Sequence, residues 1–69
     1  MPTLDLDIEG MSCGHCVASV TQALREMPGV DVKNVTIGAA QVSYEPDKVS
    51  PGDIVLAVED AGYSAQPKA

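Results

Sequence analysis

The chain opens with a short segment in which apolar and acidic residues alternate. Residues 4–9 read LDLDIE, so Leu4, Leu6 and Ile8 occupy one phase and acids occupy the other. A period of two predicts a β-strand with one buried face and one face in solvent. Gly10 follows and is expected to end this strand.

The period changes to that of a helix in residues 14–27. Apolar side chains recur there at intervals of three or four, at Val17, Val20, Leu24 and Met27. This spacing places them on one stripe and predicts an amphipathic helix. Pro28-Gly29 is expected to stop it.

A hairpin is predicted for residues 30–45. Residues 30–37 are rich in β-branched side chains, but their alternation slips, and a bulge near Lys33-Asn34 would explain the slip. Gly38-Ala39 indicates a tight turn. The second strand then alternates again, with Gln41, Ser43 and Glu45 on its polar phase.

The last third of the chain predicts a second helix and a short final strand. Ser50-Pro51-Gly52-Asp53 is typical of a helix start, with a capping hydroxyl, proline at the first position and an acid three residues after the cap. Ile54, Val58 and Ala61 form the apolar stripe, Gly62 ends the helix, and a strand follows over residues 63–66. The order β-α-β-β-α-β predicts an α+β fold in which one sheet carries both helices on one face.

Length and charge limit the classes of protein that fit. We expect the 69 residues to form a single domain (1–69), and a 45% hydrophobic content argues against disorder. The net charge of −6 leaves no basic surface for nucleic acid, and an anionic membrane would repel the chain. Complementarity would give a protein partner a basic patch, although the acids could equally serve solubility alone. The N-terminus has no signal-peptide pattern and no apolar run reaches about 20 residues, so we expect a soluble protein in the cytoplasm.

The soft chemistry of the chain is concentrated in residues 10–16, GMSCGHC. This segment contains both cysteines and the only histidine. A bridge between Cys13 and Cys16 would close a tiny loop and restrain the unfolded chain little. A closed structural zinc site needs four N or S ligands, which two cysteines and one histidine do not supply. Two thiols in the first turn of a helix, where the dipole favours thiolate, instead suit a soft ion, with Cu(I) first.

The neighbours of the two cysteines are candidates for support. On a helix Cys13 and Cys16 would lie about 60° apart and His15 about 160° from Cys13. Met11 is either a thioether ligand or, the interpretation we favour, a packing residue. His15 is either a third ligand in a metal-bridged dimer or an exposed residue that tunes the thiols. Ser12 is expected to cap or bond locally, and Tyr63 either shields the metal from the same end of the molecule or lies at the rim of the core.

The motif resembles the GMxCxxC signature of the heavy-metal-associated domain family, which includes small copper chaperones and the N-terminal modules of copper-pumping P-type ATPases. The likeness extends over nearly the whole chain, through MPGV after the first helix and VEDAGY near the C-terminus. It implies a ferredoxin-like βαββαβ fold, Cu(I) ligation by Cys13 and Cys16, and a buried Met11 that supports the loop. Histidine at position 15 and tyrosine at 63 resemble the bacterial cytosolic members. Zinc and cadmium members tend to have an acid where this chain has Ser12.

These observations together predict a cytoplasmic Cu(I) chaperone that delivers its ion to the N-terminal metal-binding domain of a copper-transporting P-type ATPase by thiolate exchange. We expect no enzymatic activity, a monomer without metal, and a Cu(I)-bridged dimer at higher loading. The start at Met1 and the short tail favour a free chaperone. The alternatives are an excised ATPase module, a carrier of zinc or another soft metal, a thioredoxin-like oxidoreductase, which lacks its expected Trp and chain length here, and a metal-free interaction domain.

Overall fold

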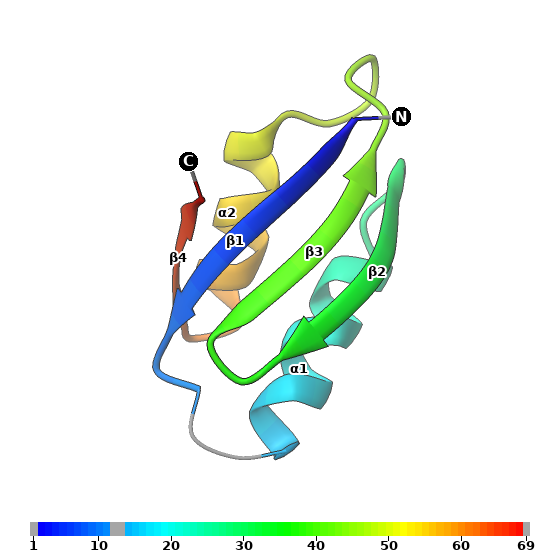
Figure 1. Cartoon of the computed structure of the whole chain (residues 1–69). Coiled ribbons are helices and arrows are strands. Elements are labelled where there is room, and N and C mark those ends of the chain that lie inside the picture. The colour runs from blue at the N-terminus through cyan, green and yellow to red at the C-terminus, as the bar shows by residue number, and fades with distance from the viewer. Residues whose placement is uncertain (1, 12–13, 69) are drawn as a thin grey trace.

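The computed structural model describes residues 2–11 and 14–68, in which strands and helices follow one another in the predicted order (Figure 1). The elements are β1 (Thr3–Glu9), α1 (Gly14–Arg25), β2 (Val30–Thr36), β3 (Ala39–Tyr44), α2 (Pro51–Asp60) and β4 (Ser64–Pro67).

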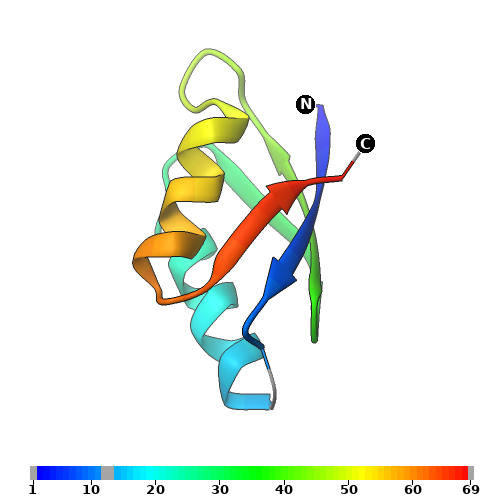
Figure 2. The same cartoon turned by 90° about the vertical axis from the view of Figure 1, so that its left-hand side faces the viewer.

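The four strands form one antiparallel sheet in the spatial order β2-β3-β1-β4. Both helices cover the same face of this sheet, and the other face is open (Figure 2). The predicted α+β class and the ferredoxin-like βαββαβ arrangement are therefore confirmed. Because β1 is a central strand, its C-terminal end emerges in the middle of one end of the sheet.

The hydrophobic core lies between the sheet and the two helices. The apolar phase of β1 faces it, since Leu6 and Ile8 are buried while Asp7 between them is exposed. The predicted helix stripes face it as well, through Val20 and Leu24 of α1 and through buried residues of α2. The side chains that are less than 2% exposed are Leu6, Val20, Leu24, Val42, Ile54 and Val58.

The slip in the alternation of β2 is a β-bulge, as predicted. Val32 pairs with Val42, and the next paired residue is Asn34, which stands opposite Gln41. Lys33 is the extra residue between them. The bulge restores the phase of the strand, so that Val35 remains half-buried on the same side as Val32.

The predicted start of α2 is confirmed in detail. The Asp53 backbone N–H donates to the Ser50 hydroxyl oxygen at 3.3 Å, and the Ser50 N–H donates to an Asp53 carboxylate oxygen at 3.1 Å. This reciprocal pair is a capping box, with Pro51 in the first turn.

Several sequence expectations were wrong in detail. Ser43 was placed on the polar phase of β3 but is only 5% exposed, because its strand is central and Thr3 and Asp31 stand opposite it on the two neighbouring strands. The first helix ends at Arg25 rather than Met27, before the Pro28-Gly29 turn. The other expected bounds differ by one or two residues: β2 ends at Thr36, α2 at Asp60, and the last strand runs from Ser64 to Pro67.

Candidate metal centre

The segment that leads into the cysteine motif is fixed by a sharp turn at Gly10. This glycine follows the last residue of β1 and has a φ of 96°, a conformation that L side chains rarely adopt. A Cβ at this position would lie 3.5 Å from Cδ1 of the Tyr63 ring. The aromatic ring therefore lies beside the start of the loop that joins β1 to α1 and carries the predicted ligand Cys13, referred to as the metal loop.

Met11 continues the loop into the core. It is 9% exposed and belongs to the main hydrophobic cluster. A buried side chain one residue after the turn anchors the loop to the rest of the domain. This burial supports the interpretation of Met11 as a packing residue.

The end of β1 is held from both sides. The Ile8 backbone N–H donates to the Gly38 carbonyl oxygen at 2.9 Å, in the turn between β2 and β3. On its other side Ile8 stands opposite Ala65 of β4. The root of the loop is therefore part of the sheet, and the hairpin turn reaches it directly.

The second half of the motif is the first turn of α1. Gly14 begins the helix, His15 is exposed, and Cys16 is partly buried and packs against the core. Ser12 and Cys13 lie outside the described residues, so the convergence of the two thiols and the capping role of Ser12 stay predictions. The described helix does separate His15, which faces solvent, from Cys16, which faces inward.

Tyr63 lies at the same end of the molecule as the motif, as the topology predicted. It follows α2, where its N–H donates to the Val58 carbonyl oxygen at 3.4 Å, and its half-buried ring packs at the edge of the core. The rim-of-core role and the position beside the loop are thus both present in one residue. The sequence placed Tyr63 at the correct end of the molecule, but the position of its ring beside Gly10 could not be read from spacing.

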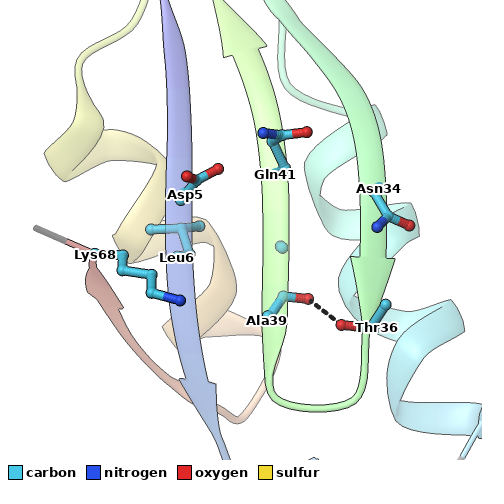
Figure 3. A pocket seen from close by; sticks show the side chains of 8 residues that line it. Asp5, Leu6, Asn34, Thr36, Ala39, Gln41 and Lys68 are labelled. Carbon is cyan, nitrogen blue, oxygen red and sulfur yellow. Dashed lines mark hydrogen bonds between the residues drawn. The ribbon is translucent and has the colours of Figure 1, made fainter.

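A hollow of about 220 Å³ lies elsewhere, on the open face of the sheet (Figure 3). Its lining comes from β1, β2 and β3 and from Lys68, which follows β4, and the polar side chains in it include Asp5, Asn34, Gln41 and Lys68. It is set between the strands on the side opposite the helices. It is therefore not part of the cysteine motif. Within residues 2–11 and 14–68, neither helix has the length and hydropathy needed to cross a membrane.

Comparison with known proteins identifies the class to which this fold and motif correspond. The sequence model of the heavy-metal-associated domain family matches residues 5–64. The chain belongs to this family. A copper chaperone, CopZ of Bacillus subtilis strain 168, is 47% identical over 60 residues, which cover 84% of this chain and 87% of that protein.

Solved structures agree with this assignment. A copper-binding domain from the P-type ATPase HMA7 superimposes with a TM-score of 0.96 at 34% identity, covering 100% of this chain and 96% of that one. The Cu(I)-loaded N-terminal domain of a potential copper-translocating P-type ATPase from Bacillus subtilis gives a TM-score of 0.85 at 30% identity, covering 97% and 86%. The chain is thus similar both to free copper chaperones and to modules of ATPases.

Proposed function

We propose that this protein is a copper chaperone that binds one Cu(I) between Cys13 and Cys16 and passes it to the N-terminal metal-binding domain of a copper-transporting P-type ATPase. The observation that carries the proposal is the placement of Cys16 in the first turn of α1. Gly10 and Met11, the first residues of the loop that leads to this helix, lie at the same end of the molecule. A helix N-terminus favours thiolate, and two thiolates suit a soft monovalent ion. The similarity to proteins named as copper chaperones supports the same cargo.

The low coordination number of the bound Cu(I) ion explains how it can be transferred. An ion held by two thiolates leaves room for a thiolate of a partner protein to attack, after which the original ligands leave one at a time. The ion stays bound to sulfur throughout, and no electron is transferred. His15, exposed beside Cys16, is positioned to influence this exchange from the solvent side.

The surroundings of the site define its other roles. Met11 holds the loop to the core and Tyr63 covers its first residue, while Ser12 is assigned to local hydrogen bonding. The thiols require a reducing compartment, for which we propose the cytoplasm. We assign no catalytic role to any residue, and we expect a monomer without metal and a Cu(I)-bridged dimer at higher loading.

A titration of the reduced protein with Cu(I) under anaerobic conditions tests the proposal. The protein competes with a coloured chelator of the bicinchoninate type, and the titration is repeated with Zn(II). We expect one tightly bound Cu(I) per chain, weak zinc binding, and loss of copper uptake in the Cys13→Ser and Cys16→Ser variants. Equal or stronger binding of zinc would reassign the chain as a carrier of zinc or of soft metals in general.

The thioredoxin-like alternative is tested with the same reduced protein. Reduction of insulin disulfides should be negligible, because the motif is proposed to exchange metal rather than electrons. Turnover of the disulfide substrate that is lost in Cys16→Ser would make the chain an oxidoreductase. The alternative of an excised ATPase module predicts the same copper chemistry. The observation in support of this alternative is the similarity of the chain to the ATPase domains.

A further inference from the structure

Two large hydrophobic side chains are exposed in the part of the chain that the structure describes. Ile37 and Leu56 are each 58% exposed. A single exposed apolar residue is ordinary on a protein surface and identifies no site by itself. Their positions, however, differ in a way that bears on the proposed exchange of metal.

Ile37 lies in the turn of the β2–β3 hairpin. This turn is tied to the root of the metal loop by the 2.9 Å hydrogen bond from the Ile8 N–H to the Gly38 carbonyl oxygen. In both views the hairpin turn, the end of β1 and the start of α1 lie at one end of the molecule (Figures 1 and 2). Leu56 lies instead in the middle of α2, away from this end.

Acidic side chains stand beside the hairpin turn. Asp7 is the partner of Ala39 across the sheet, and Glu9 follows Ile8 at the end of β1. Both acids are exposed. The hairpin end of the molecule therefore combines one exposed apolar side chain with two carboxylates.

The open face of the sheet has a different character. Most of the side chains that surround its hollow are polar, including Asp5, Asn34, Gln41 and Lys68 (Figure 3). A partner that docked there would bury polar groups and would remain far from the thiols. Exchange of an ion between two proteins requires their metal loops to come within bonding distance, so the partner must cover the end that carries Ile37.

We propose that Ile37 is a docking contact for the partner's metal-binding domain, and that this domain offers it an apolar patch with a basic residue nearby for Asp7 or Glu9. The inference rests on the proposed function and identifies the surface that the partner would contact. Burial of the exposed part of an isoleucine side chain favours association by about tenfold in the dissociation constant. Complementary charge would chiefly accelerate the encounter.

The test measures the transfer of Cu(I) from the loaded full chain to a purified partner. The probe is the N-terminal domain of the copper-translocating P-type ATPase from Bacillus subtilis, at varied concentration. Ile37→Ser is compared with Leu56→Ser, a matched control because the two side chains have the same size and the same exposed fraction. Circular dichroism and chelator competition establish that each variant is folded and binds Cu(I) like the wild type.

We expect Ile37→Ser to raise the concentration of partner needed for half-maximal transfer about tenfold. The conservative variant Ile37→Leu should need the same concentration of partner as the wild type. Leu56→Ser should leave transfer unchanged, and Asp7→Asn should reduce the dependence of the rate on salt. Equal transfer by wild type and Ile37→Ser, or equal slowing by Leu56→Ser, would overturn the docking contact and leave the chaperone function standing. Absence of transfer from the wild-type chain would overturn both.

Discussion

Gly29 lies where the turn after α1 meets the loop before α2. Its φ is 81°, and a Cβ built on it would lie 2.9 Å from Cβ of Lys48, closer than real side chains approach. The Gly29 carbonyl oxygen also accepts a 2.8 Å hydrogen bond from the Glu45 N–H. Two loops that are distant in sequence are thus joined at a position that only glycine fits.

Replacing Gly29 with alanine should therefore lower the free energy of unfolding by about 2 kcal/mol, from the strained φ together with the displaced loop. Urea denaturation of the reduced, metal-free protein measures this. Gly52→Ala is the control, because a Cβ there meets nothing closer than the Ser50 hydroxyl at 3.7 Å. That control should stabilise α2 slightly, and a loss equal to that of Gly29→Ala would contradict the argument.

At the scale of the element, α2 depends on its first turn. The capping box gives side-chain acceptors to two backbone N–H groups at the helix start, those of Ser50 and Asp53. Asp53 also places a negative charge at the positive end of the helix. The last turn of α2 has no basic residue, so its charge complementarity is concentrated at the N-terminus. The helix carries Ile54 and Val58 into the core, so its stability is linked to that of the whole fold.

The change Ser50→Ala should destabilise the protein by about 1 kcal/mol. The Asp53 N–H loses the Ser50 hydroxyl as an acceptor and keeps only the Ser50 carbonyl oxygen at 3.0 Å. The same chemical change at Ser19, an exposed position inside α1, should stabilise slightly, since alanine is the better helix former. Thermal denaturation of the two variants compares them. The melting temperature is expected to fall in Ser50→Ala and to rise slightly in Ser19→Ala. A rise in Ser50→Ala would show that the capping box contributes nothing to stability.

Most elements could be predicted because their patterns are local. The alternation in residues 4–9, the stripe of α1 and the cap at Ser50 each depend on neighbours in sequence, and even the bulge at Lys33 left a visible slip in phase. The burial of Ser43 could not be read in this way, because it depends on which strands flank β3. A strand in the centre of a sheet covers small polar side chains that would be exposed at an edge.

The candidate site follows the same rule. The motif and its position between a strand and a helix were readable, and so was the end of the molecule on which Tyr63 lies. The position of the Tyr63 ring beside Gly10 and the hydrogen bond from Ile8 to Gly38 were not readable, since both depend on the pairing of distant segments. Ile37 was therefore missed, although its place beside the Gly38 turn was a signal that the hairpin tip would be exposed.

At the scale of the whole molecule, charge is distributed unevenly between the two signs. Ten acids face four bases, and the ion pairs in the described part are exposed, with Lys33 to Asp31 at 2.8 Å and Lys48 to Glu45 at 3.2 Å. Exposed pairs of this kind contribute little to stability. The repulsion among the remaining acids is therefore expected to outweigh the attraction of the pairs.

Salt should accordingly stabilise the protein. Raising sodium chloride from about 10 mM to about 300 mM shortens the screening length from about 30 Å to about 6 Å and weakens the repulsion. The urea midpoint of the metal-free protein is expected to rise. Chloride is used rather than sulfate, which strengthens hydrophobic burial by itself. A midpoint that falls with salt would mean that the ion pairs dominate.

The two ends of the described chain lie away from the metal loop. Pro2 accepts a hydrogen bond from the Tyr44 N–H at the beginning of β1, and the Lys68 N–H donates to Asp5, whereas the loop follows Glu9 at the other end of the same strand (Figure 1). A tether attached at Pro2 or Lys68 therefore leaves the molecule without crossing Gly10 or the first turn of α1. Copies of this domain can therefore be joined in series, or fixed to a bead or a larger protein, with the end of the molecule that carries Gly10 and the start of α1 left uncovered.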